Sequence, residues 1–243
     1  MVKFITKKYL LDNYILNANK VLKMNNFYRT IKKTINTKFQ YICKVITEDK
    51  FNLLDVGAGN QSASKTKAVF PNCQYYGLDI DKNTNYNNND FNLMENFYEL
   101  DLTKLDYQII PDNFFDYINM AHVIEHLHNG DLVIPLLLEK LKSNGYFYIE
   151  YPGKKSLNLP SMHGTLNFYD DPTHVRLYSI NELSKIFQSH NCSIISFGVR
   201  RNWYYILLMP FRVIHALIFT GKLRGNLFWD IFGFAEYLFI KKL

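Results

Sequence analysis

Two glycines and two aspartates fall at spacings that suit the binding of a nucleoside. The segment Asp55-Val56-Gly57-Ala58-Gly59 ends a short apolar run, and its glycines would let a ligand approach the backbone where a strand turns into a helix. Asp79 lies twenty residues past Gly59 and ends a second apolar run. An acid at the end of a second strand can accept hydrogen bonds from both ribose hydroxyls. Each feature alone is weak, but together they predict a nucleoside site.

The residues around this turn favour S-adenosylmethionine over NAD. Ser62 stands where the dinucleotide pattern requires a third glycine at a pyrophosphate-binding helix terminus. S-adenosylmethionine has no phosphate but carries a sulfonium and an ammonium group, so an acid such as Asp55 suits it better. Asp101 ends a third apolar run, and we expect its carboxylate, or the amide of Leu102, to bind the adenine. The alternative role for Asp101 is a helix cap or turn former.

The segment His122-Val123-Ile124-Glu125-His126 has the spacing of an inverted zinc-protease motif. On a helix, its two histidines would share one face and could hold Zn²⁺. Because the segment follows the nucleoside pattern, we expect no metal and expect activity to survive a chelator. His122 and the backbone near Ala121 are expected close to the methionine or the acceptor. The alternative for His126 is a hydrogen-bonded helix cap.

A long polar and aromatic loop, residues 153–179, follows the fifth apolar run. Loops of this length inside a compact domain are usually functional, and a histidine is a suitable base near neutral pH. We expect His174 or His163 to take a proton from the acceptor, with Asp170 or Asp171 as orienter or alternative base. The alternative is that Asp171 only builds a turn. The catalytic candidates are therefore His174, His163, His122 and Asp171.

Apolar runs and helix-forming segments alternate along the chain, which predicts βαβ units and a mostly parallel sheet. In such a sheet the ligand lies beyond the carboxyl ends of the strands. Residues 1–50 are expected to be helical, because Phe27, Ile31, Ile35, Phe39, Ile42 and Ile46 recur at helical spacing. Strands are expected over 52–56, 74–80, 97–101, 115–121 and 146–151, with helices over 62–70 and from an Asp131 N-cap through Lys142 to a stop at Asn144-Gly145. In that helix Pro135 is expected in the first turn, where proline is tolerated.

Five segments together resemble the class I S-adenosylmethionine-dependent methyltransferase family, over about residues 50–200. They are 53–59, 77–79, 99–102, 115–127 and 141–146, in order and at fitting spacings. One departure is Gln61, where many members carry a third glycine. The resemblance implies a Rossmann-like α/β fold: a mostly parallel seven-stranded sheet with an antiparallel last strand and helices on both faces. Its final hairpin is expected over 193–199 and 236–242.

The resemblance also implies roles for the residues of the cofactor site. Asp55, Gly57 and Gly59 would face the methionine part and Asp79 the ribose, and Ala58 and Ile80 are expected among the cofactor contacts beside them. Asp101 and Leu102 would face the adenine, while Ala121 and His122 complete the expected cofactor contacts. Some quinone-modifying members hold a divalent ion with a Glu-x-x-Glu-His segment, but here the first position is His122.

The loop at 153–179 resembles that of methyltransferases that modify surface polysaccharides and sugars, which favours a sugar or glycan hydroxyl as the acceptor. The alternatives are a small quinone-like acceptor, an RNA methyltransferase, a non-catalytic binding protein, or an NAD-dependent sugar oxidoreductase or epimerase. The last class needs a Tyr-x-x-x-Lys pair on one helix, and Pro152-Gly153 between Tyr151 and Lys155 argues against a helix there. No DNA partner is expected.

Charge is distributed unevenly along the 243 residues. Residues 1–50 hold eleven Lys and Arg against three acids, a net charge of +8, whereas the remainder carries −2. We therefore expect a basic helical arm over 1–50 and a methyltransferase domain over 51–243. The arm could attract an anionic partner or simply be a solvated face. The slightly acidic domain argues against RNA binding.

The segment 203–234 is unusually apolar, but Pro210, Arg212 and His215 interrupt it before it reaches the length of a membrane span. We expect a helical insertion that acts as a lid over the acceptor, a homodimer interface or a peripheral membrane contact. No signal peptide is evident. The three cysteines lack metal-binding spacing, so we expect free thiols in a reducing, cytoplasmic compartment.

Overall fold

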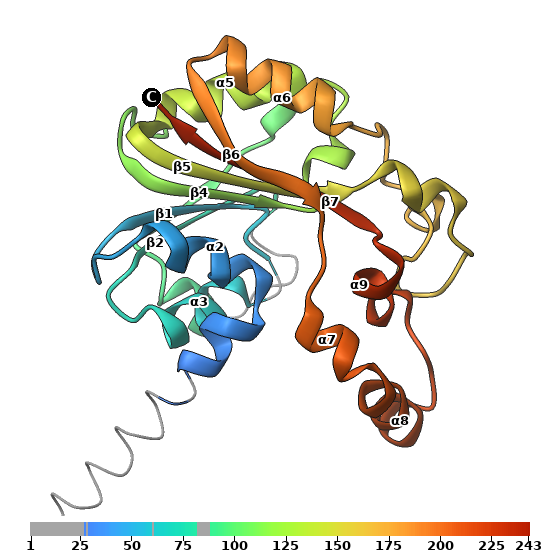
Figure 1. The fold of residues 1–243 in the computed structure, drawn as a ribbon. Helices are drawn as coiled ribbons and strands as arrows, with labels where there is room; N and C mark the ends of the chain where they lie inside the picture. Colours follow the sequence, from blue (N-terminus) through green and yellow to red (C-terminus); the bar gives the residue numbers. More distant parts are fainter. Residues whose placement is uncertain (1–26, 28, 60, 82–87) are drawn as a thin grey trace, which may run out of the picture.

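The computed structural model describes residues 27, 29–59, 61–81 and 88–243, which form a sheet between two helical layers (Figure 1). Most of the expected N-terminal arm, residues 1–26 and 28, lies outside the described residues. Of the expected helical stripe, Phe39 and Ile42 are buried, whereas Phe27 is 67% exposed.

The sheet has seven strands in the order β3-β2-β1-β4-β5-β7-β6. β7 pairs antiparallel with both β5 and β6, and the other pairs are parallel. This confirms the expected fold class and the final hairpin. The strands are β1 (Asn52–Val56), β2 (Gln74–Asp79), β3 (Asn96–Glu99), β4 (Phe115–Ala121), β5 (Leu141–Pro152), β6 (Cys192–Val199) and β7 (Ala235–Lys242).

Helices cover both faces of the sheet: α5 and α6 lie on one face, and α2 and α3 on the other (Figure 1). Because β7 is antiparallel, its first residues mark the carboxyl ends of its neighbours, and α9 lies there. The α-helices are α2 (Thr37–Val45), α3 (Ser62–Val69), α4 (Asn88–Phe91), α5 (Gly130–Lys140), α6 (Ile180–Ser189), α7 (Trp203–Leu207), α8 (Met209–Thr220) and α9 (Trp229–Phe232). The 3-10 helices are η1 (Leu102–Lys104), η2 (Ile124–His126), η3 (Lys154–Asn158), η4 (Phe168–Asp170) and η5 (Gly225–Leu227).

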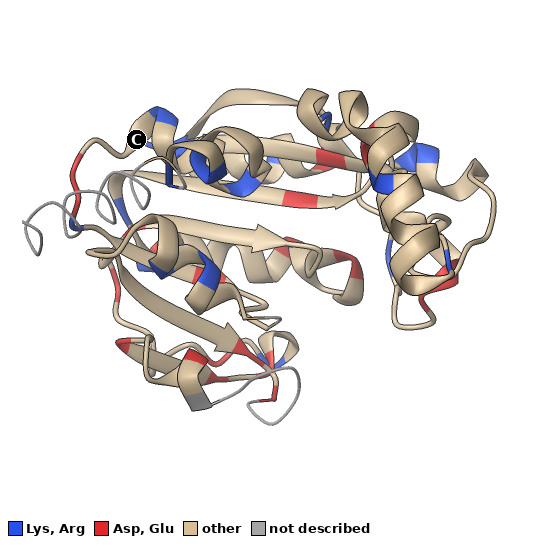
Figure 2. Ribbon diagram, turned by 90° about the horizontal axis from the view of Figure 1, so that it is seen from below, with Lys and Arg blue, Asp and Glu red and all other residues tan. Residues whose placement is uncertain are grey.

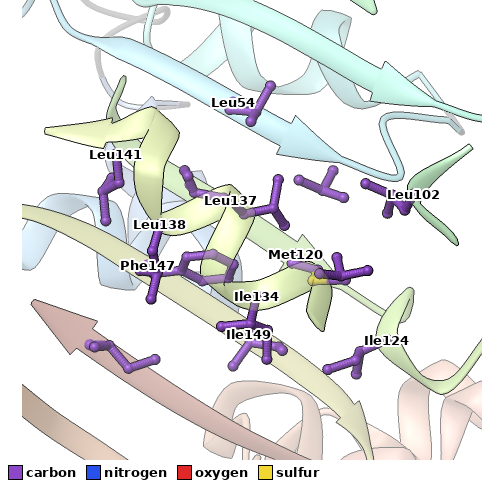
Figure 3. Packing of buried hydrophobic residues seen from close by; sticks show 14 of the residues in the cluster. Leu54, Leu102, Met120, Ile124, Ile134, Leu137, Leu138, Leu141, Phe147 and Ile149 are labelled. Carbon is purple, nitrogen blue, oxygen red and sulfur yellow. The ribbon is translucent and has the colours of Figure 1, made fainter. Parts of the chain in front are cut away.

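The larger core lies between the sheet and the α5–α6 layer. Alternate residues of each central strand face this layer, so Leu54 and Val56 of β1 belong to the same buried cluster as Phe147 of β5. Figure 3 shows Ile134 and Leu137 of α5 among these strand side chains. Burial of both sheet faces explains why the central strands are nearly continuous apolar runs in the sequence.

The core on the opposite face is rich in aromatic rings. Tyr41 of α2 stacks on Tyr148 of β5, with ring centroids 4.7 Å apart, and it also contacts Phe239 of β7 at 5.1 Å. The position of α2 against the sheet thus depends on Tyr41 and on its buried neighbours in the same helix, Phe39 and Ile42.

The expected helix from Asp131 to Lys142 is wrong at both ends. Its N-cap is Asn129, and Leu141 already begins β5 and pairs with Phe115. The register of β4 and β5 then shifts before Tyr146, so Asn144 lies within an irregular strand. Pro135 lies inside the helix, not in its first turn, and the burial of four apolar side chains offsets the lost backbone bond.

Charged residues of both signs are interspersed over the described ribbon (Figure 2). Within the described part of the chain, no helix combines the length and the apolar character that crossing a membrane requires.

Tyr178 caps the start of α5 from a buried position. Its hydroxyl donates to the Leu127 carbonyl at 2.7 Å and accepts from the Gly130 amide at 3.0 Å. Tyr178→Phe should lower the free energy of unfolding by about 1–3 kcal/mol, because both backbone groups stay buried without a partner. Chemical denaturation would measure this loss.

Tyr151→Phe is the matched control. Tyr151 is equally buried, but its hydroxyl has no hydrogen-bond partner among the described residues. Removing that hydroxyl should leave stability unchanged or raise it. Equal losses in the two variants would contradict the assigned role of Tyr178.

Candidate active site at the carboxyl ends of the strands

A cavity of about 590 Å³ lies at the carboxyl ends of the strands. Its lining includes eight of the ten residues expected from the sequence to bind the cofactor: Gly57, Gly59, Asp79, Ile80, Asp101, Leu102, Ala121 and His122. Its remaining lining residues were not predicted as ligand contacts: Leu78, Leu100, Thr103, Val123, His126, Leu127 and Trp229.

Gly57 lets the first turn pass close to the cavity. Its φ is +75°, and a Cβ atom there would lie 2.4 Å from Cγ2 of Val123. The amides of Gly57 and Ala58 both donate to the Leu78 carbonyl, at 2.8 and 3.2 Å. A side chain at position 57 would therefore strain the turn and collide with Val123, which also lines the cavity.

Asp55 and Ala58 do not line the cavity, because both are buried under the turn. The Asp55 carboxylate accepts from Lys38 Nζ at 2.6 Å, from Tyr75 OH at 2.6 Å, from Asn119 Nδ2 at 2.6 Å, and from the Ser62 hydroxyl. In this arrangement Asp55 fixes the turn from below and makes no contact with the cavity.

Two carboxylates reach the cavity from neighbouring strands. Asp79 ends β2, and its Oδ1 accepts from the Ile80 amide at 2.8 Å. Asp101 caps η1 rather than ending β3, and its Oδ1 accepts from the amide and the hydroxyl of Thr103. The Thr103 hydroxyl lowers the pKa of Asp101. Leu78, Leu100 and Leu102 also line the cavity and make part of its lining apolar, which suits a purine.

His122 lies between two buried carboxylates and does not belong to a helix. Its φ is +56°, its Nε2 lies 3.0 Å from Glu150 Oε1, and its Nδ1 lies 3.3 Å from Glu125 Oε1. Burial opposes protonation of the imidazole, but these two acids raise the pKa of His122 to about 9. The side chain is thus a cation at neutral pH, which makes the expected role of general base unsuitable for it.

Glu150 and Arg200 complete this buried charge network. Burial favours a neutral Glu150, but Arg200, 3.3 Å away, and His122 lower the pKa of its carboxyl to about 2. The inverted zinc-protease arrangement is not formed, because His122 is turned towards Glu150 while His126 lies against Thr173.

His126 and His174 lie side by side at one end of the cavity, with ring centroids 4.9 Å apart. His126 lines the cavity. The side chain of His174 is only 5% exposed, and its Nε2 lies 3.9 Å from both Glu125 Oε1 and Asp171 Oδ2. The expected base His174 is therefore behind His126 rather than at the cavity surface.

The acids of the 153–179 loop shape the loop itself. Asp170 accepts from the amides of Met162, Leu166 and Asn167, at 2.8 to 3.0 Å. Asp171 accepts from the amide and hydroxyl of Thr173, which matches the turn-building alternative. His163 is exposed, and its carbonyl accepts from the Gly225 amide; it does not line the cavity.

Comparison with known proteins decides the family of the chain. Residues 24–196 match the family model described as a methyltransferase domain. The chain belongs to the methyltransferase family. No curated protein sequence matches this methyltransferase.

Solved structures share its fold at low sequence identity. A SAM-dependent methyltransferase from Archaeoglobus fulgidus is 21% identical, with a TM-score of 0.52, and the match covers 95% of this chain and 99% of that one. The Haloferax volcanii complex of the Trm112 activator with a putative methyltransferase is 12% identical, with a TM-score of 0.59, and the match covers 88% of this chain and 93% of that one. Phosphoethanolamine N-methyltransferase 2 from Haemonchus contortus, in complex with S-adenosyl-L-methionine, is 15% identical, with a TM-score of 0.55. The match covers 85% of this chain and 51% of that one.

S-adenosylmethionine is the cofactor of this methyltransferase, and the cavity suits it. Asp79 and Asp101 offer hydrogen-bond acceptors at the cavity, and its leucines offer apolar lining. Ser62, at the place of the missing third glycine, donates to Asp55, so the turn is built around an acid and not a phosphate. When bound, the cofactor supplies an electrophilic methyl group on sulfur.

The apolar segment 203–234 reaches the cavity through Trp229. The Trp229 ring lies 4.7 Å from that of His122, and its Nε1 donates to the Thr165 carbonyl at 2.5 Å. Trp229 had no local signal in the sequence, because only the fold brings it beside β4.

Asp79→Ala should weaken S-adenosylmethionine binding by about 1.5–3 kcal/mol, the scale of lost charge-assisted hydrogen bonds. Calorimetry should report this as a dissociation constant about 10- to 150-fold higher. Asp106→Ala is the control, since Asp106 is exposed and outside the cavity. Tight binding of NAD with no heat from S-adenosylmethionine would contradict the assignment.

Proposed function

We propose that this methyltransferase O-methylates a hydroxyl group of a sugar or glycan. The proposal rests on the residues that line the cavity apart from Asp79 and Asp101. His122, His126 and the Trp229 ring line it there, next to the long polar loop that carries His174. An aromatic ring can pack on a sugar ring, and imidazoles can hydrogen-bond to hydroxyls.

In the proposed reaction the acceptor oxygen attacks the methyl carbon in line with the carbon–sulfur bond. That bond breaks with its electron pair kept on sulfur, which gives a methyl ether and S-adenosylhomocysteine. The hydroxyl proton must leave at the same end of the cavity. Of the two imidazoles that line this end, His122 is held between Glu125 and Glu150, which leaves His126. We propose that His174 contributes through its contact with His126 rather than by touching the acceptor.

We propose that the segment 203–234 is a lid over the acceptor. Its Trp229 lines the cavity, and Arg200, which precedes it, lies 3.4 Å from Asp230 within the segment. The outer side of α8 exposes Phe211, Ile218 and Phe219 by 70 to 72%. For that surface, a homodimer interface and a peripheral membrane contact remain predictions.

The alternative of an NAD-dependent oxidoreductase lacks its catalytic pair. Tyr151 belongs to β5 and is fully buried in the core, whereas Lys155 belongs to η3. The alternative of an RNA methyltransferase receives no support from the distribution of charged residues, since Lys and Arg are interspersed with Asp and Glu along the ribbon (Figure 2).

Incubation with radiolabelled S-adenosylmethionine and a panel of nucleotide sugars, glycans, quinols and phosphoethanolamine tests the acceptor class. We expect label in a sugar fraction, as a methyl ether stable to mild alkali. Label confined to the quinols or to phosphoethanolamine would refute the sugar proposal, while the methyltransferase assignment would stand.

His126→Ala should lower turnover by about 10²–10⁴-fold and leave cofactor affinity nearly unchanged, because the nucleoside contacts lie at the other strand ends. His163→Ala should stay within a few-fold of the wild type, since His163 is exposed and outside the cavity. Steady-state kinetics and calorimetry on both variants make the comparison. Full activity of a folded His126→Ala protein would remove the histidine cluster from the mechanism.

A further inference from the structure

We propose that Glu125, His126 and His174 form a binding site for one divalent transition-metal ion at the acceptor end of the cavity. Each residue offers one ligand atom, and the three atoms lie within 4.8 Å of one another. Two imidazole nitrogens and one carboxylate are a common set for ions such as Zn²⁺ that leave further positions open. The site does not depend on the acceptor being a sugar.

Backbone carbonyls orient both imidazoles in the same way, with Nδ1 at the carbonyl and Nε2 on the other side of the ring. Nδ1 of His174 lies 2.6 Å from the Phe168 carbonyl, and Nδ1 of His126 lies 3.0 Å from the Thr173 carbonyl. A carbonyl only accepts, so each Nδ1 is the donor of its hydrogen bond and each Nε2 is the ring nitrogen left for a ligand. Histidines that ligate metals are typically oriented by this kind of hydrogen bond.

Glu125 supplies the independent observation that points to a ligand. Its side chain is 1% exposed, and Oε2 has no hydrogen-bond partner among the described residues. Oε1 lies 3.3 Å from His122 and 3.9 Å from His174. A buried carboxylate oxygen without a partner is costly, and a cation beside it would remove that cost.

The charged side chains around the three proposed ligands favour a bound cation. Glu125, Glu150 and Asp171 are acids of this cluster and its neighbourhood, and Arg200, which contacts Glu150, also contacts a further acid, Asp230. The carboxylates therefore outnumber the arginine, and metal ligation requires both ligand histidines to be neutral. A divalent ion would bring these groups closer to electrical balance.

This set differs from the one that the sequence suggested. The spacing of His122, Glu125 and His126 resembled a metal-binding motif, and the nucleoside pattern that precedes it favoured a site without metal. In the structure His122 is paired with Glu150, and the second imidazole comes instead from His174 in the distant loop. The proposal therefore replaces the expectation of a metal-free site.

The location suggests what the ion would do. His126 lines the cavity beyond the nucleoside-binding acids, so an open coordination position would face the acceptor. Coordination of the acceptor hydroxyl lowers its pKa. The proton would then pass to water in the cavity as the oxygen attacks the methyl carbon.

Metal binding to the full-length protein, without acceptor or cofactor, tests the site. After removal of metals with a chelator, titration with Zn²⁺ and Mn²⁺ in a calorimeter should show one ion per chain, with Mg²⁺ bound more weakly because nitrogen ligands suit it less. Co²⁺ should give a visible absorption band typical of mixed nitrogen and oxygen ligands. No stoichiometric binding of Zn²⁺, Mn²⁺ or Co²⁺ would overturn the proposal.

Variants show whether the ion is bound at this cluster. His126→Gln and His174→Gln should each weaken binding by at least about 100-fold, beyond the 10- to 100-fold typical of lost outer partners, and should abolish the Co²⁺ band. His128→Gln is the control, because His128 is exposed and only two residues from His126. Thermal melting checks that each variant is folded. Unchanged affinity in both folded ligand variants would overturn the proposal, whatever the acceptor screen finds.

Discussion

The buried carboxylate of Asp55 holds together the elements on which the cavity depends. It is 1% exposed, and its donors come from α2, α3, β2 and β4: Lys38, Ser62, Tyr75 and Asn119. A buried carboxylate is tolerable only when its partners are complete, so the end of β1 depends on contacts with all four elements. The Gly57 turn that follows then faces the cavity with backbone alone. The cofactor site is thus a consequence of packing on the opposite side of the turn.

Much of the fold could be predicted because both faces of the sheet are buried. Continuous apolar runs predicted the bounds of β1, β2 and β4 to within one residue, and the acids or glycines at their ends indicated the carboxyl ends of the strands. The boundary of α5 and β5 could not be read locally. Leu141 leaves the helix because it pairs with Phe115. The register of β4 and β5 is irregular before Tyr146, and the Asn144-Gly145 pair lies within β5 instead of ending a helix.

The candidate site was predictable in the parts that lie beside strand ends. Asp79 and Asp101 reach the cavity as expected, whereas Asp55 is turned to the other face of the sheet by the alternation of β1. Contacts between distant segments gave no signal: His174 meets His126 through the long loop, and Trp229 reaches His122 from the far end of the chain. The role of each histidine depends on these contacts, which fix Nδ1 of His174 and place His122 between two acids.

A crystal structure with S-adenosylhomocysteine tests the central claim most directly, because it locates both ends of the cofactor in one experiment. The account predicts ribose hydroxyls within hydrogen-bonding distance of Asp79, adenine near Leu102, and the sulfur directed towards the end of the cavity lined by His126 and Trp229. Binding outside this cavity, or with the sulfur directed away from the histidines, would contradict the claim that the carboxyl ends of the strands form the methyl-transfer site.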